Sequence, residues 1–221
     1  ELRTPLAAST SATSTLAETT DMTGQQRMLV GEIQEANQRL NRIVGNLLEV
    51  TRLEAGKVVP RMDWYDARDI VQTTIRELRR ELAENPLTVE LPPEPMLVKC
   101  DFSLMQHALA NLLVNAMVHT PRGTAVEVAA RFVGNSVVLS VGDRGPGIPT
   151  QLMPRIFEKF FRAPDAPTGG SGLGLTITKG FIEAQGGTIT AENRPGGGAL
   201  LSLRLPQPEK APLGSQTEPR P

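Results

Sequence analysis

The segment Asp143-Arg-Gly-Pro-Gly-Ile-Pro149 follows an apolar run, 137–141, that has the composition of a buried strand. A carboxylate at a strand end, followed by two glycines, can accept a hydrogen bond from a ligand amine while the backbone approaches that ligand closely. The alternative is an ordinary Gly-Pro turn. The segment opens a glycine-rich region, because 13 of the 20 glycines lie between residues 142 and 198.

A second segment, Asn111-Leu-Leu-Val-Asn115, lies upstream in an apolar helical pattern that spans 103–119. The two asparagines are four positions apart, so their carboxamides point from one face of the helix. Two such oxygens can help to hold a hard cation such as Mg²⁺, together with phosphate oxygens and water. The alternative is a pair of surface amides without a ligand.

A third segment, Gly169-Gly-Ser-Gly-Leu-Gly-Leu175, links a loop to the predicted start of a helix. Glycines there allow backbone N–H groups to reach phosphate oxygens at the positive end of that helix. The spacing fits neither the dinucleotide-binding fingerprint nor a P-loop. Just before it, Phe157-Glu-Lys-Phe-Phe-Arg162 contains two cations, Lys159 and Arg162, that either reach a phosphate or are simply solvated.

The rest of residues 60–205 alternates between helical and extended patterns. We predict further helices at 66–83, 149–157 and 172–185, and strands at 86–91, 96–98, 125–133, 136–141, 188–193 and 199–205. This mixture predicts an α+β fold, a sandwich in which one mixed sheet carries helices on one face. The last segment, 206–221, holds five prolines and no apolar periodicity, so we expect a disordered tail.

The first block, 1–57, has a helical pattern instead. Its apolar positions recur alternately four and three residues apart over about three heptads. These positions are Leu29, Ile33, Ala36, Leu40, Ile43, Leu47 and Val50. Thr23 is a plausible N-cap of this helix and Gly56 a natural stop.

A single helix of about 30 residues cannot bury such a seam alone. We expect 1–20 to pair with it as an antiparallel hairpin, bent at Pro5 if helical residues precede that proline. Two hairpins would form a dimeric four-helix bundle through 1–55. The alternative is a monomeric hairpin packed on the second domain.

Composition excludes several classes of protein. The chain has 221 residues and a formal net charge of −1, so nothing in its charge favours nucleic acid or an anionic membrane as a partner. The single cysteine, Cys100, excludes a disulfide framework and a multi-cysteine metal site. No apolar run approaches the roughly 18 residues that span a bilayer.

The order and spacing of the three segments, with the phenylalanine-rich stretch between the last two, resemble the N, G1, F and G2 boxes of the sensor histidine kinases of two-component systems. At the front, Glu1-Leu-Arg-Thr-Pro-Leu6 resembles the H box of that family. The resemblance implies a dimerisation and phosphoacceptor domain at 1–57. It also implies a Bergerat-type domain at 58–205 that binds ATP and Mg²⁺. An aspartate on a response regulator receiver domain would be the partner.

The resemblance also implies roles for single residues. Asp143 would bind the adenine amino group, Gly145 and Gly147 would shape the pocket, and His119 would lie near the nucleotide. Asn111 and Asn115 would hold Mg²⁺. The backbone at Gly170, Gly172 and Gly174 would pass over the phosphates, and residues 158–171 would form a mobile lid. Lys159 and Arg162 become candidate phosphate contacts, whereas Val118 stands where the family often has a basic residue.

The family's phosphoacceptor histidine would come immediately before Glu1. Glu1 resembles the acidic residue that acts as general base toward it, and Thr4 the residue that orients water for dephosphorylating a partner. We expect this chain to be a fragment that begins one residue after that histidine. We therefore predict that it binds ATP without phosphorylating itself.

Two other functions remain open. A topoisomerase-type or mismatch-repair ATPase shares the Bergerat pocket, but the hairpin and the phenylalanine-rich segment argue against it. The second alternative function is that of a non-enzymatic module that docks a response regulator, or of a response-regulator phosphatase. We expect a cytoplasmic location with no membrane contact, as the soluble part of an inner-membrane sensor. Similarity at 91–98 and 193–199 extends to the Kdp potassium-sensing branch.

Overall fold

The computed structural model describes residues 3–18, 22–164 and 170–208. Its helices are α1 (Arg3–Ala17), α2 (Gly24–Glu54), α3 (Ala67–Glu77), α4 (Phe102–Val118) and α5 (Gly174–Ala184), with 3₁₀ turns η1 (Glu81–Glu84) and η2 (Met153–Arg155). Its strands are β1 (Asp63–Asp66), β2 (Leu87–Glu90), β3 (Leu97–Cys100), β4 (Val126–Phe132), β5 (Ser136–Asp143), β6 (Thr188–Asn193) and β7 (Ala199–Pro206).

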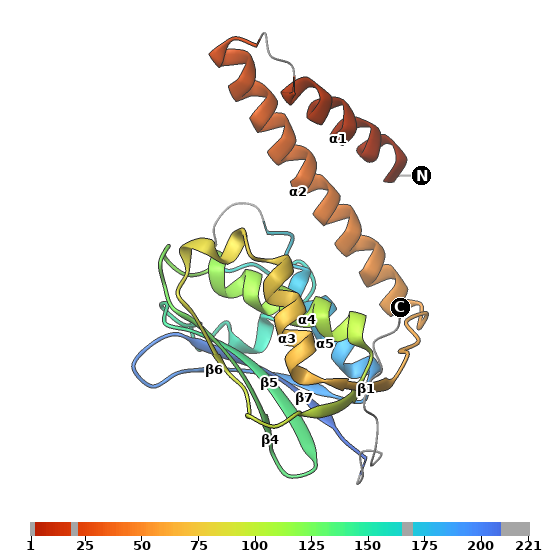
Figure 1. The fold of residues 1–221 in the computed structure, drawn as a ribbon, viewed down its shortest axis with the longest axis vertical. Helices are drawn as coiled ribbons and strands as arrows, with labels where there is room; N and C mark the ends of the chain where they lie inside the picture. The colour runs from red at the N-terminus through yellow and green to blue at the C-terminus, as the bar shows by residue number, and fades with distance from the viewer. Residues whose placement is uncertain (1–2, 19–21, 165–169, 209–221) are drawn as a thin grey trace.

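Helices α1 and α2 form the predicted hairpin, which projects from the α/β part of the molecule (Figure 1). Thr23 caps α2 in a capping box with Gln26, and Gly56 follows the helix at a φ of 61°. The predicted N-cap at Thr23 and the predicted end of the helix at Gly56 are therefore confirmed. Helix α1 begins at Arg3 as described, so Pro5 lies in its first turn, where proline is tolerated, and the bend expected at Pro5 stays a prediction.

The contact between α1 and α2 is polar at its centre. Buried Asn37 accepts a hydrogen bond from Ser9 Oγ at 3.2 Å and lies 3.5 Å from Thr13 Oγ1. Asn41 donates to Thr10 Oγ1 at 3.2 Å. The small polar residues of α1 thus pair with amides of α2. The heptad seam lies on another face, where Leu29, Ile33, Leu40 and Leu47 are exposed.

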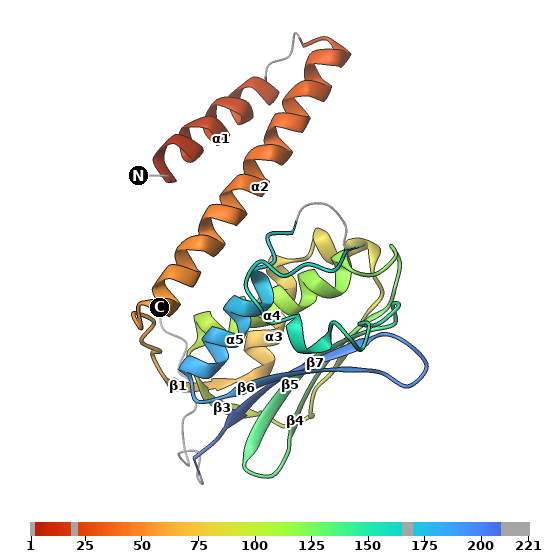
Figure 2. The same ribbon diagram turned by 180° about the vertical axis from the view of Figure 1, so that it is seen from behind.

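Five strands form one sheet in the order β2-β4-β5-β7-β6, in which β2 pairs parallel with β4 and the other pairs are antiparallel. Helices α3, α4 and α5 cover one face of this sheet (Figures 1 and 2). The α+β sandwich is therefore confirmed. A separate pair, β1 and β3, was not expected as a second sheet.

Some predicted bounds were wrong. The helix predicted at 66–83 ends at Glu77, and 149–157 contains only the short turn η2. Gln207 is buried and accepts from the backbone N–H of Lys99 at 2.7 Å, so the folded part extends past 205. Residues 209–221 of the predicted tail lie outside the described residues.

The lower half of α2 packs against α5 (Figure 2). Val50, buried to 5% exposure, joins Leu173, Ile177 and Phe181 in a small apolar cluster separate from the main core. Leu53 lies over Gly180, where a Cβ would come within 2.6 Å of its side chain. The seam residue Val50 thus contacts the second domain. Within the described residues, no helix combines the length and apolarity needed to cross a membrane.

Candidate functional site

Asp143 ends the buried central strand β5 and is itself 7% exposed. Its Oδ1 accepts hydrogen bonds from the backbone N–H groups of Gly145, at 2.8 Å, and Ala199, at 3.2 Å. Among the described residues, Oδ2 has no hydrogen-bond partner. A buried carboxylate with one fixed oxygen and one available acceptor suits recognition of a ligand N–H.

The two glycines after Asp143 are required by close contacts. A Cβ on Gly145 would lie 2.5 Å from Thr120 Cγ2, beyond the end of α4. Gly147 has a φ of +77°, and a Cβ there would lie 2.8 Å from Asn193 Oδ1. The backbone of this loop therefore requires glycine at both positions, and the predicted role of the two glycines in shaping a nucleotide pocket stays a prediction.

Asn111, Asn115 and the C-cap residue His119 follow one another at four-residue intervals along one face of α4. Asn111 Nδ2 lies 3.4 Å from both Gly174 O and Thr178 Oγ1, so this amide joins α4 to the start of α5. The carboxamide of Asn115 has no hydrogen-bond partner in the described part of the chain, although its backbone carbonyl accepts from the N–H of His119 at 3.0 Å. The two asparagines therefore differ: Asn115 is available to a ligand, and Asn111 also has a structural contact.

His119, the C-cap of α4, is surface-accessible but lies near two charged groups. Partial burial lowers its pKa, the positive charge of Arg162 lowers it further, and Asp143 opposes this shift. The three residues come from the N, F and G1 segments of the sequence. The contact between Thr120 and Gly145 brings the first and the last of these segments together independently of this shift.

The glycine loop leads into α5, whose N-cap residue Leu173 makes no side-chain capping hydrogen bond. The first N–H groups of α5 therefore lack a side-chain acceptor, the arrangement that binds phosphate oxygens at helix N-termini. Gly172 has a φ of +69°, and a Cβ there would lie 2.7 Å from the backbone of Phe160. Gly174 begins α5 and lies beside Asn111, whereas Gly170 is in open space.

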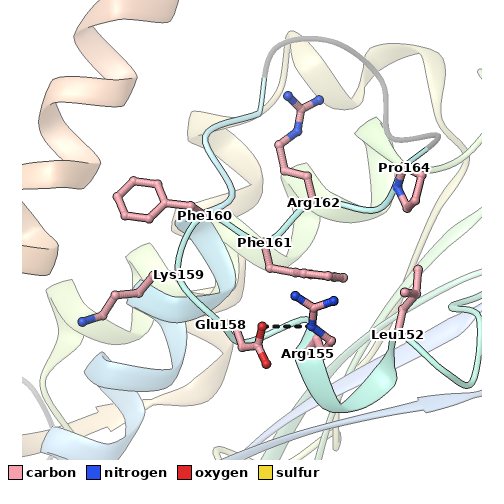
Figure 3. Close-up of a pocket in the computed structure, with 8 residues that line it drawn as sticks. All are labelled: Leu152, Arg155, Glu158, Lys159, Phe160, Phe161, Arg162 and Pro164. Atoms are coloured by element: carbon pink, nitrogen blue, oxygen red, sulfur yellow. Dashed lines mark hydrogen bonds and ion pairs between the residues drawn. The ribbon is translucent and has the colours of Figure 1, made fainter.

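A surface pocket of about 370 Å³ lies beside this loop, between Leu152 and Pro164 (Figure 3). Arg155 forms an ion pair with Glu158 at 3.1 Å and stacks on Phe161, with its guanidinium carbon 4.6 Å from the ring centroid. Lys159 and Phe160 extend from the other side of the loop (Figure 3).

Lys159 forms an ion pair with Glu54 at the end of α2, a partner that sequence reasoning missed. Asn46 Nδ2 also donates to Ser171 Oγ at 3.2 Å, so α2 contacts the loop on both sides of 165–169. Arg162 is exposed and faces away from Arg155 (Figure 3). Thr4 is exposed in the first turn of α1, and Glu1 lies outside the described residues.

Two family models match the chain: the His Kinase A (phospho-acceptor) domain at 1–56, and the histidine kinase-, DNA gyrase B- and HSP90-like ATPase at 100–209. The sensor-like histidine kinase SenX3 of Mycobacterium tuberculosis is 37% identical over 213 residues, 93% of this chain and 51% of SenX3. The chain belongs to the two-component sensor histidine kinases.

Other members of this family match comparably. The sensor protein KdpD of Clostridium acetobutylicum is 31% identical over 213 residues, 94% of this chain and 24% of KdpD. The expected similarity to the Kdp branch is confirmed, but SenX3 has the higher identity, so the similarity is not specific to that branch. The chain spans between about a quarter and a half of the length of these curated relatives.

Solved sensor kinases share the fold. The structure of full-length ShkA in complex with AMPPNP has a TM-score of 0.78 at 26% identity, covering 96% of this chain and 45% of that chain. The histidine kinase ThkA in complex with the response regulator protein TrrA has a TM-score of 0.68 at 22% identity, covering 93% of this chain and 58% of that chain.

Proposed function

We propose that this sensor kinase chain is a catalytic portion that binds ATP with Mg²⁺ in the space between α4, α5 and the loop after β5. The supporting observation is that α4 contacts α5, and that the residues directly after α4 contact the loop after β5. Asn111 lies beside the start of α5, and Thr120 lies against Gly145, next to the buried carboxylate of Asp143. The relative ShkA, solved with AMPPNP, supports the same ligand class.

In this proposal, Asp143 accepts a hydrogen bond from the adenine amino group, and Gly145 and Gly147 allow the base to approach. The N-terminus of α5, with Gly170, Gly172 and Gly174 before and at its start, binds phosphate oxygens. His119, Lys159 and Arg162 flank the nucleotide, and the two cations contact phosphate. Residues 158–171 would serve as the lid, and 165–169 of this segment lie outside the described residues.

The donor set near the phosphates fits Mg²⁺. Carboxamide oxygens with phosphate oxygens are suitable hard ligands for this ion. No cluster of three His, Cys, Asp or Glu side chains that could hold a metal occurs in the described ranges. Asn115 would hold the ion, because its carboxamide has no other partner among the described residues, and Asn111 would assist. Mg²⁺ would neutralise charge that develops on the phosphates during transfer.

In the intact protein, the γ-phosphoryl group of ATP would pass to the histidine that precedes Glu1, leaving ADP, and then to an aspartate of a response regulator. Glu1 would accept the proton of the attacking imidazole. Without that histidine, this chain should bind ATP and remain unphosphorylated. We place the domain division at 57/58, with the whole chain as the cytoplasmic part of an inner-membrane sensor.

Two measurements with labelled ATP test this function. Equilibrium dialysis should show saturable binding by the chain in Mg²⁺, and Asp143→Asn should weaken it. Incubation with γ-labelled ATP should leave no stable label on this chain but label a version extended upstream through the histidine. Absence of ATP binding would exclude the proposal, and stable label on the short chain would contradict its second part.

We further propose a homodimer through 1–55 that receives a response regulator. The support is the unpaired seam of α2, where four large apolar side chains are 40–47% exposed: Leu29, Ile33, Leu40 and Leu47. Burying such a seam against a second hairpin would form a four-helix bundle. The match to ThkA, solved with TrrA, is consistent with a regulator as partner.

Exposure of Thr4 on α1 supports a second candidate activity, dephosphorylation of that regulator. Thr4→Ala should abolish regulator dephosphorylation and leave regulator binding intact. If the wild-type chain binds a phosphorylated regulator without accelerating its dephosphorylation, the chain is a docking module only.

A further inference from the structure

A short turn between β6 and β7, residues 193–198, lies directly against the loop that follows β5. The side chain of Asn193 bonds the backbone of Ile148 twice: its Oδ1 accepts from Ile148 N, and its Nδ2 donates to Ile148 O, both at 2.7 Å. A single carboxamide thus fixes the far end of the 143–149 loop as a neighbouring strand would.

The same turn contacts the near end of the loop. Arg194 donates from Nη1 to the carbonyl oxygen of Asp143, at 3.5 Å, and its Nη2 lies 2.6 Å from Glu127 Oε2 on β4. Arg144 also binds Glu127, at 3.1 Å. The Arg194 side chain is only 16% exposed, and the two arginines lower the pKa of Glu127.

Two glycines make this approach possible. A Cβ on Gly142 would lie 2.7 Å from Arg194 Nη1, and a Cβ on Gly198 would lie 2.0 Å from the carbonyl oxygen of Asp143. The residue after the turn, Ala199, donates its N–H to Asp143 Oδ1. The turn and Ala199 together therefore contact the carboxylate and the carbonyl of Asp143 and the loop that follows it.

We infer that the 193–198 turn positions the Asp143 carboxylate for base recognition, with Asn193 and Arg194 as its positioning residues and Glu127 as the anchor of Arg194. The inference rests on the proposed function, because it assigns Asp143 to the adenine amino group. Neither Asn193 nor Arg194 touches the nucleotide in this account. They hold Oδ1 on two backbone N–H groups, so that Oδ2 remains the acceptor for the 6-amino group.

The test compares two nucleotides, ATP and purine riboside triphosphate, which lacks the 6-amino group. The wild-type chain should bind ATP more tightly, by about tenfold, because only ATP pairs with Oδ2. Asn193→Ala and Arg194→Ala should each reduce this preference by at least about threefold, mainly through weaker ATP binding. Arg194→Lys, which keeps one charged donor, should restore part of the preference.

Arg204→Ala is the matched control. Arg204 also donates its guanidinium to a carbonyl, that of Val133 at 3.1 Å, but at the opposite end of the same sheet. It should leave the preference unchanged. If an alanine variant of the turn fails to fold, Glu127→Gln tests the same anchor with a smaller change, and it should reduce the preference as well.

Three outcomes would overturn the inference. Folded variants that lose affinity for both nucleotides by the same factor would show a merely structural turn, and variants with unchanged affinities would show no role. An equal loss of preference in Arg204→Ala would show that the effect is not local. If the wild-type chain binds neither nucleotide, the proposed function itself fails, which separates the two failures.

Discussion

Glu54, at the end of α2, forms an ion pair with Lys159 in the loop before α5, so the hairpin directly restrains a cation that we assign to the nucleotide phosphates. Both side chains are about half exposed, at 45% for Lys159 and 55% for Glu54, so either can exchange partners. Glu54 and a phosphate would compete for the same ammonium group.

This competition predicts that Glu54→Gln tightens ATP binding by about twofold to fivefold, the range expected for a partly exposed ion pair. Glu49→Gln is the control, because Glu49 lies on the same helix and pairs with Arg52 instead. Isothermal titration of both variants in Mg²⁺ makes the comparison. Unchanged or weaker binding by Glu54→Gln would mean that Lys159 does not serve the phosphates.

The turn glycines give a matched pair for stability. Gly196 and Gly198 have φ values of +85° and +94°, so alanine is strained at either position, by ~1–2 kcal/mol. A Cβ at Gly196 meets no atom within 4 Å, whereas one at Gly198 meets the Asp143 carbonyl oxygen at 2.0 Å. Gly198→Ala should therefore cost a further ~1–3 kcal/mol in the free energy of unfolding.

Urea denaturation of Gly196→Ala and Gly198→Ala measures this difference directly. Gly198→Ala should also weaken ATP binding, since the carbonyl it displaces belongs to Asp143. Equal destabilisation by the two substitutions would show that the turn relaxes away from β5 without cost.

Much of this site follows from the sequence because each glycine segment needs a local backbone property. Gly147 and Gly172 have positive φ, and α5 begins at Gly174, two residues after its predicted start, behind an N-cap residue whose side chain makes no capping hydrogen bond. The pairing of Asn193 with Ile148, and of Lys159 with Glu54, joins residues 45 and 105 positions apart. No local periodicity encodes such contacts, so tertiary packing alone reveals them.

The misplaced elements have local causes. Pro149 and Pro154 occur within the predicted helix 149–157, and a proline in a helix interior removes a backbone donor, so only a 3₁₀ turn forms. Strand β1 was missed because its four residues, Asp63–Asp66, begin and end with aspartate, a residue depleted in strands. Pairing with β3 stabilises it despite this composition.

His119 predicts a pH dependence of stability. Its pKa in the folded chain is below the ordinary 6.5, so the unfolded chain binds more protons than the folded chain between those two values. The free energy of unfolding should therefore fall as pH decreases through 6.5 toward the folded pKa. His119→Gln should flatten this slope in urea denaturation series.

Arg162 offers an independent check on the same group, because its charge contributes to the lowered pKa of His119. Arg162→Gln should raise the His119 pKa in an NMR titration of the imidazole protons, with His119→Gln assigning the resonance. A titration unaffected by Arg162→Gln would place the loop cation away from the end of α4.

The exposed seam of α2 predicts the oligomeric state. Leu40, at the middle of the seam, is 45% exposed in the single chain and would be buried between two hairpins. Leu40→Asp would then bury an unpaired charge and should weaken dimerisation at least tenfold, by an order-of-magnitude estimate.

Gln38→Asp is the control for Leu40→Asp, since it adds the same charge on an exposed position off the seam. Sedimentation equilibrium should show a dimer for the wild type and Gln38→Asp, and a monomer for Leu40→Asp at the same concentration. A monomeric wild-type chain, or a dimer that survives Leu40→Asp unchanged, would contradict assembly through this face.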